Sequence, residues 1–291
     1  MRMLPVLFLA GMVAAPVAAR QIGVSIDARS VAPGELLVVH AKTEAPATSV
    51  SVMAFGYPIP AFETDLDSWT ALVGVDLDVK PGAYKIRIEA VTGAGPTQAV
   101  VKTEHPIRVL PKTFRTRTLT VDEAFVNPPK SVEARILEEA KDLEAVWHGS
   151  QPVRLWAGPF VRPVPQAANS AFGTRSIFNK EVRSAHGGAD FASPTGTPVL
   201  SPNAGRVALA RNLYFTGNTV IVDHGLGLLS LFAHLSVMDV AENDMVTTGQ
   251  SLGQVGATGR VTGPHLHWAV RAGGARVDPL SLLALVGQGA Q

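Results

Sequence analysis

The sequence predicts an all-β protein built from two β units that are joined by a connector containing one helix. Short apolar runs broken by turn residues fill the first third, one segment near the middle has helical spacing, and a Gly/Pro-rich stretch with short apolar runs follows. The chain of 291 residues is longer than a usual single domain, and its 46% hydrophobic and 17% charged residues are typical of a globular protein.

Residues 20–110 are predicted to form the first β unit, an antiparallel sandwich of immunoglobulin-like type. Pro33-Gly34 and Lys80-Pro81-Gly82 supply turns between apolar, β-branched runs. The predicted strands are 24–26, 36–40, 49–55, 69–79, 84–92 and 99–109. The run Pro81-Gly82-Ala83-Tyr84, followed by alternating Ile86 and Ile88, resembles bacterial immunoglobulin-like domains. A likeness of fold carries little information on function.

Residues 111–152 are predicted to be the connector. A polar stretch from Lys112 to Pro129 precedes a helix over 131–146, with Ser131 as its N-cap. The apolar residues at helical spacing are Val132, Ile136, Leu137, Ala140, Leu143 and Val146. We expect this helix to pack between the two β units or against one of them.

Residues 153–291 are predicted to form the second, antiparallel β unit. Its predicted strands are 199–200, 206–211, 219–223, 228–233 and 265–271. Five of the eight histidines of the chain lie between 186 and 267, so this unit holds most of the candidate chemistry.

Composition excludes several classes of function. The formal net charge is +1 and no dense Lys/Arg run is present, so nucleic acid is a poor candidate partner. Cysteine is absent, which excludes disulfides and thiolate catalysis. A metal site would therefore have to use histidine and carboxylate ligands.

The first nineteen residues have the pattern of a secretory signal peptide. A positive start at Arg2 precedes an apolar run over 4–13, and Val17-Ala18-Ala19 supplies small residues for cleavage. The apolar run is too short for a membrane anchor. We expect a mature chain beginning near Arg20, with no membrane-spanning segment.

Three short segments carry the candidate chemistry. The first is His186-Gly187-Gly188-Ala189-Asp190, in which an even spacing can return two metal-ligand side chains to one side of an extended chain, although this spacing alone is commonly accidental. The second is His265-Leu266-His267-Trp268, where strand alternation places both histidines on one face and Leu266 and Trp268 on the other.

The third segment is Phe232-Ala233-His234-Leu235, which ends an apolar run. A single histidine after such a run is more often structural than catalytic. His224, in Asp223-His224-Gly225, is interpreted in the same way, as a turn residue.

Together these segments resemble the lysostaphin-type, or LytM-like, zinc peptidases of the M23 peptidase family. The resemblance runs in order through the blocks 172–175, 186–192, 195–199, 205–207, 232–235, 256–267 and 277–280. It implies that His186, Asp190 and His267 bind one zinc ion per chain, and that His234 and His265 are the catalytic histidines. It also implies a LytM-like peptidase fold for residues 153–291. No His-Glu-x-x-His helix is present, so the arrangement with a glutamate base is not expected.

Two positions depart from the family pattern. Phe232 stands where the family often has Tyr, so we expect a substrate or oxyanion contact of a phenol hydroxyl to be lost while the metal ligands are kept. Ala269 stands where an acidic or small residue is common, a departure that we interpret as neutral.

With export, the resemblance implies hydrolysis of peptide bonds in peptidoglycan stem peptides or cross-bridges. The alternative is a non-catalytic cell-wall-binding or regulatory protein on the same fold, and a closed structural or storage zinc site is a third interpretation. The periplasm is favoured, because no wall-binding repeat is evident, and secretion stays open. A regulatory protein partner also stays open, and so does the role of the first β unit.

Overall fold

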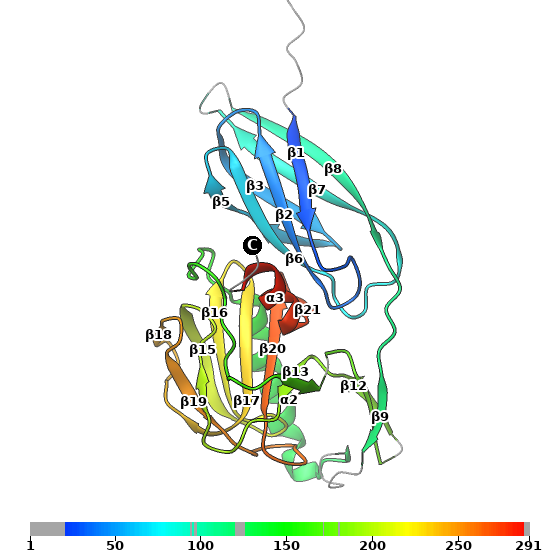
Figure 1. The fold of residues 1–291 in the computed structure, drawn as a ribbon, viewed down its shortest axis with the longest axis vertical. Helices are drawn as coiled ribbons and strands as arrows, with labels where there is room; N and C mark the ends of the chain where they lie inside the picture. The colour runs from blue at the N-terminus through cyan, green and yellow to red at the C-terminus, as the bar shows by residue number, and fades with distance from the viewer. Residues whose placement is uncertain are drawn as a thin grey trace, which may run out of the picture.

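The computed structural model describes residues 21–93, 95, 98–119, 126–170, 172–179 and 181–287 (Figure 1). These residues are mostly β-strand, with the helices α2 (Lys130–His148) and α3 (Pro279–Val286), as the predicted all-β class requires. The predicted signal peptide at 1–19 lies outside the described residues. The division of the chain at 110 and 152 stays a prediction.

The N-terminal β unit, residues 21–110, consists of two four-stranded antiparallel sheets. One has the order β1-β2-β6-β5 and the other the order β4-β3-β7-β8. The strands are β1 (Ile22–Asp27), β2 (Leu36–Thr43), β3 (Ala47–Ala54), β4 (Tyr57–Pro60), β5 (Phe62–Asp65), β6 (Ser68–Gly74), β7 (Gly82–Thr92) and β8 (Ala99–Val109). Inward residues of both sheets, such as Val39 and Ile88, share one core. The immunoglobulin-like type of this unit stays a prediction.

Strands β4 and β5 were not predicted from the sequence. Both lie at sheet edges. Strand β4 contains two prolines, Pro58 and Pro60, and β5 is acidic, so neither has the apolar alternation that identifies a strand. An edge strand tolerates proline because one side of its backbone needs no partner. The predicted strand over 69–79 ends earlier, at Gly74.

The connector is more structured than predicted. Strand β9 (Thr116–Leu119) lies inside the stretch predicted to be a polar linker, and it pairs in parallel with β11. Helix α2 begins after Pro129 and has no side-chain cap, so the predicted Ser131 cap is wrong. The apolar face is also narrower than predicted, because Leu137 is 72% exposed.

Helix α2 packs against the C-terminal β unit. Leu143, Val146 and Trp147 contact a cluster of buried residues that includes Leu209 and Leu231. The helix was predicted to pack either between the two β units or against one of them, and it packs against one, the C-terminal unit.

The C-terminal β unit, residues 153–287, is organised by a ten-stranded sheet with the central order β10-β13-β20-β17-β16-β15-β18. Its strands are β10 (Ala168–Ser170), β13 (Gly188–Phe191), β14 (Pro198–Leu200), β15 (Gly205–Leu213), β16 (Gly217–Gly225), β17 (Leu228–Met238), β18 (Met245–Val246), β19 (Ser251–Val255), β20 (Leu266–Ala272) and β21 (Ala275–Val277). Strands β11 (Arg175–Phe178) and β12 (Glu181–Ala185) form a smaller sheet with β9.

The two β units pack against one another, with α3 and β21 facing the N-terminal unit (Figure 1). Leu36 and Leu72 of the first unit belong to the same apolar cluster as Trp156 and Phe160 of the second. Near them the Glu35 carboxylate, 5% exposed, accepts a hydrogen bond from the Ser281 hydroxyl at 2.9 Å.

Charged groups also join the two units. Lys112 and Arg29 both pair with Glu35, and Arg276 binds Asp76 and Asp78. The buried carboxylate of Glu35 thus has partners from the N-terminal unit, the connector and α3. Within the part of the chain that the structure describes, neither helix is long and apolar enough to cross a lipid bilayer.

Candidate metal centre and its flanking histidines

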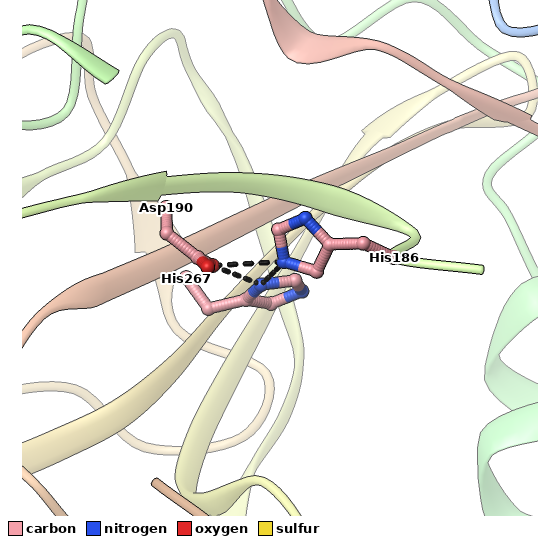
Figure 2. Close-up of side chains that lie close together, drawn as sticks. All are labelled: His186, Asp190 and His267. Carbon is pink, nitrogen blue, oxygen red and sulfur yellow. Dashed lines mark hydrogen bonds and ion pairs between the residues drawn. The ribbon is translucent and has the colours of Figure 1, made fainter. Parts of the chain in front are cut away.

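Two neighbouring strands bring the predicted metal ligands together (Figure 2). Asp190 lies on β13 and pairs in register with His267 on β20, while His186 precedes β13. Because side chains alternate along a strand, Ala189 and Trp268 point to the opposite face and are fully buried there. The register thus aims Asp190 and His267 at the same point.

The three ligand atoms form a close triangle. The His186 Nε2 atom lies 2.9 Å from Asp190 Oδ1 and 3.0 Å from His267 Nδ1, and the His267 Nδ1 atom lies 2.9 Å from Asp190 Oδ1. Each imidazole nitrogen carries at most one proton and the carboxylate carries none when ionised, so hydrogen bonds cannot satisfy all three contacts at once. A cation in contact with all three atoms would satisfy them together, and two imidazoles with a carboxylate are a zinc-binding donor set.

Burial and neighbouring charge shape the ionisation of this cluster. Burial disfavours the ionised form of Asp190, but hydrogen bonds from His186 and His267 outweigh burial and place the pKa of Asp190 well below its usual range. Burial lowers the pKa of His267, against the opposing effect of the Asp190 carboxylate. A carboxylate and a neutral imidazole are the forms that bind a metal ion.

His265 lies beside this triangle, as the alternation in His265-Leu266-His267 predicted. Its Nε2 atom is 3.8 Å from Asp190 Oδ1. Its Nδ1–H donates to the Gly263 carbonyl at 2.9 Å. Since a carbonyl only accepts, this bond fixes the proton on Nδ1 and leaves the Nε2 lone pair available on the side of the cluster.

His234 reaches the cluster through an unusual backbone conformation. Its ring centroid lies 4.9 Å from that of His265 and 6.0 Å from that of His267. Strict alternation would place His234 on the face of Phe232, which is buried in the core. At His234, however, φ is +66°, and the pairing of β17 shifts register just beyond it. This left-handed residue with its β-bulge turns the imidazole toward the other histidines.

Burial lowers the pKa of His234 to about 3, with further lowering from the nearby His267 and His265. Its Nδ1–H donates to the Thr258 carbonyl at 2.9 Å, which fixes the tautomer as at His265. His234 is therefore a neutral imidazole whose Nε2 atom can accept a proton.

A turn and a loop that sequence reasoning missed hold His234 in place. The His234 backbone N–H donates to the carbonyl of Thr216, in the turn between β15 and β16. The loop that carries Thr258 packs directly on that turn. A Cβ on Gly217 would lie 2.3 Å from the Thr258 hydroxyl, and one on Gly259 would lie 2.4 Å from the Gly217 nitrogen. Both glycines also have positive φ, so this packing requires glycine at both positions. The positions of the histidines in the sequence do not indicate that the carbonyls of Thr216 and Thr258 accept hydrogen bonds from His234.

Two sequence-based interpretations in this region are wrong. His224 is not a turn residue but a fully buried residue of β16, bonded to the Ala204 carbonyl and the Ser230 hydroxyl. Phe232 does not face the cluster either. It is fully buried on the opposite face of the sheet, stacked on Trp268 with ring planes 7° apart. A hydroxyl at this position would therefore point into the core rather than toward a substrate.

Comparisons with known proteins agree with this arrangement. The sequence profile of Peptidase family M23 matches residues 184–279. The Vibrio cholerae peptidoglycan DD-endopeptidase ShyA is 42% identical over 95 residues, which are 33% of this chain and 22% of that protein. The Caulobacter vibrioides cell division protein DipM is 35% identical over 147 residues, which are 50% of this chain and 23% of that protein. The chain thus spans less than a quarter of either relative.

One solved structure matches nearly the whole chain. A crystal structure from Pseudomonas aeruginosa, described there as a peptidase of family M23, is 33% identical with a TM-score of 0.69. The match covers 88% of this chain and 96% of the crystallised one. With the profile match over the metal cluster, this places the chain in its family: it belongs to the M23 peptidases.

Proposed function

We propose that the protein is an exported zinc metalloendopeptidase that hydrolyses peptide bonds in peptidoglycan stem peptides or cross-bridges. The observation that carries the proposal is the triangle of His186, Asp190 and His267 with two more imidazoles, of His234 and His265, directly beside it. The resemblance stated above matches these five residues position by position.

In this proposal His186 Nε2, His267 Nδ1 and Asp190 Oδ1 would hold the zinc ion. Three protein ligands leave a further position for water or substrate, which distinguishes a catalytic zinc from a closed structural one. A bound zinc ion would supply Lewis acidity that polarises the scissile carbonyl and eases deprotonation of water. Asp190, already ionised, offsets part of the positive charge at the site.

His234 and His265, which flank the metal ligands, would carry out the proton transfers. Each donates through Nδ1–H to a backbone carbonyl, of Thr258 or of Gly263, so each presents Nε2 to the reaction centre. Either neutral imidazole can accept the proton of the attacking water at Nε2. The imidazole that has taken this proton carries an Nε2–H, which can stabilise the oxyanion and then protonate the leaving amine.

The names of the relatives support the substrate class. ShyA is named as a peptidoglycan DD-endopeptidase, and a Neisseria meningitidis relative, 42% identical over 97 residues, as a DD-carboxypeptidase/endopeptidase. Peptidoglycan lies outside the cytoplasm, so the proposal includes removal of residues 1–19 and a periplasmic location.

The test is digestion of purified peptidoglycan by the full mature chain. Mass spectrometry of the released muropeptides identifies the bond that is cut, and elemental analysis measures the zinc content. We expect one zinc per chain, release of soluble muropeptides, and loss of both after treatment with a chelator.

Three variants separate metal binding from proton transfer. His186→Ala should lose zinc and activity, whereas His234→Ala should keep zinc and lose activity. His148→Ala is the matched control, because His148 is an exposed residue of α2. If the wild type binds zinc but releases no peptide under any condition, the alternative of a non-catalytic wall-binding or regulatory protein replaces this proposal.

A further inference from the structure

A groove on the N-terminal β unit has the properties of a second binding site. It has a volume of about 910 Å³ and lies along β3 and β7, far from the histidine cluster in the sequence. Phe55 and Tyr84 line it with their rings in edge contact, 5.2 Å between centroids. Aromatic rings presented in an open groove are typical of surfaces that bind sugars or peptides.

Phe55, which lines the groove and packs against the core of the N-terminal unit, has a backbone conformation that is unusual for an aromatic residue. Phe55 has φ of +52° and Gly56 has φ of +89°, the signs of a type I′ turn between β3 and β4. Asn, Asp or Gly usually takes the first of these positions, and the left-handed conformation costs another residue about 1–2 kcal/mol. A bulky aromatic residue there is an observed outlier of the kind that marks a ligand contact.

The charges of the groove are predominantly positive. Lys80, Lys85 and Arg87 line it, together with the single acidic residue Asp78. The Asp78 carboxylate is already paired with Arg276 of the C-terminal unit. A single carboxylate, of Glu104, serves both Lys85 and Arg87, and Lys80 has no acidic partner within the described ranges. The groove therefore suits an anionic ligand.

The groove continues toward the C-terminal unit. A smaller cavity of about 280 Å³ shares Phe55, Asp78 and Val79 with it and is closed on its other side by Gly273 and Ala275. Gly273 follows β20, the strand that begins beside His265 and carries His267. At roughly 3.3 Å per residue, the stretch from His267 to Gly273 spans roughly 20 Å.

We propose that this groove binds the peptidoglycan strand itself, an anionic polymer of sugar rings and carboxylate-bearing peptides. The sugar faces would pack on Phe55 and Tyr84, and the peptide carboxylates would pair with Lys80, Lys85 and Arg87. The choice of occupant rests on the proposed function. The groove then holds one part of the polymer while a neighbouring stem peptide reaches the histidine cluster.

The experiment measures cosedimentation of the full mature chain with purified peptidoglycan, in a His234→Ala background that prevents digestion. Replacing Lys80, Lys85 and Arg87 together by Gln should weaken binding about tenfold at low salt, since exposed ion pairs are individually weak and three are removed together. High salt should weaken binding of the unchanged protein in the same way. Phe55→Asn, which suits the turn, should also weaken binding, and thermal unfolding checks that both variants fold.

Lys85→Gln and Lys102→Gln form a matched pair. Both lysines lie on neighbouring strands of one sheet, are 62% and 65% exposed, and pair with a glutamate, but only Lys85 lines the groove. Lys102→Gln should bind as the unchanged protein does. Equal binding by the triple variant and Lys102→Gln would overturn the inference.

Hydrolysis of a soluble stem peptide by the wild type, measured in parallel, tests the proposed function separately. Peptidoglycan binding that depends on the groove residues, without hydrolysis of the soluble peptide, would refute the proposed peptidase activity and support the groove as a binding site. Hydrolysis of the peptide together with peptidoglycan binding that does not depend on the groove residues would support the peptidase and refute the groove as a binding site.

Discussion

At the scale of single residues, the site depends on backbone acceptors as much as on the histidines. The carbonyls of Thr258 and Gly263 each accept from an imidazole Nδ1–H and so decide which nitrogen faces the reaction centre. The same carbonyls give His234 and His265 the same tautomer, and burial lowers the pKa of His234.

Phe232→Tyr tests whether the side chain at position 232 faces the core rather than the histidine cluster. The ring is fully buried against Trp268 on the face away from the cluster, so the added hydroxyl cannot reach a substrate. We expect turnover of peptidoglycan peptides to stay within about twofold of the wild type, because the added hydroxyl would lie on the face of the sheet away from the reacting groups. Initial rates on a soluble peptide provide the measurement. A rise of tenfold or more would show that position 232 faces the site after all.

His224 should make the fold sensitive to acid. Burial lowers its pKa from 6.5 to about 4, so between these values the unfolded chain binds a proton that the folded chain does not. The contribution to stability is complete above the unfolded pKa and declines as the pH falls, by about 1.4 kcal/mol per pH unit and by about 3 kcal/mol in all.

His224→Gln should therefore be less stable at pH 7, by about 1–3 kcal/mol for the lost hydrogen bonds, yet lose less stability between pH 7 and 5. Urea unfolding at both pH values gives the comparison. His148→Gln serves as the control, since His148 is exposed. Equal pH dependence of His224→Gln and wild type would contradict the prediction.

At the scale of elements, helix α2 supports the site through the turn that carries Thr216. The Glu139 carboxylate accepts from the Tyr214 backbone N–H at 2.8 Å and from Arg135 at 2.6 Å. Arg135 in turn donates to the carbonyl of Asn212, near the end of β15 and just before this turn. The connector helix is thus bonded to the turn on which His234 depends.

Glu139→Ala should lower stability by about 1 kcal/mol, because the partly buried Tyr214 N–H loses the Glu139 acceptor. We expect a fall in turnover without loss of zinc, since the effect reaches His234 and not the metal ligands. Glu138→Ala is the matched control, one residue away on the exposed side of the helix. Thermal unfolding, zinc content and peptide hydrolysis are measured together. Loss of zinc from Glu139→Ala would show that the helix supports the metal ligands rather than His234 alone.

At the scale of the whole molecule, apolar and ionic contacts join the two β units, and the closest of these contacts include the end of β6. Gly74 at the end of β6 lies against the C-terminal unit, where an added Cβ would come within 2.6 Å of Ala275 and 2.8 Å of Val277. Arg276 beside them binds Asp76, and this contact lowers the pKa of the Asp76 carboxyl despite its burial.

Gly74→Val should force the units apart and cost about 2 kcal/mol, within the range for overpacking a core. We expect the single unfolding transition of the wild type to broaden or split into two in calorimetry. Gly23→Val on the outer strand β1 is the control, because its Cβ would meet its neighbours only at 3.8 Å. An unchanged single transition in Gly74→Val would mean that the contact at Gly74 does not couple the unfolding of the two units.

The sequence by itself determined the class of fold and the identity of the chemical groups. Alternation in His265-Leu266-His267-Trp268 predicted which side chains share a face, because that pattern follows from strand geometry alone. The helix near the middle was predictable for a similar local reason. Local patterns also predicted β15, β16 and β17, with errors only at their ends.

Only the tertiary structure decided what depends on contacts between distant segments. His234 faces the cluster because a left-handed residue and a bulge reverse its alternation, and His224 and Phe232 are buried because neighbouring strands cover them. The polar run that becomes β9 pairs with a strand far along the chain. Each of these outcomes depends on contacts with distant segments, which a local sequence pattern does not indicate. The sequence therefore determines which reactive groups are present, and the tertiary structure determines how their side chains are oriented.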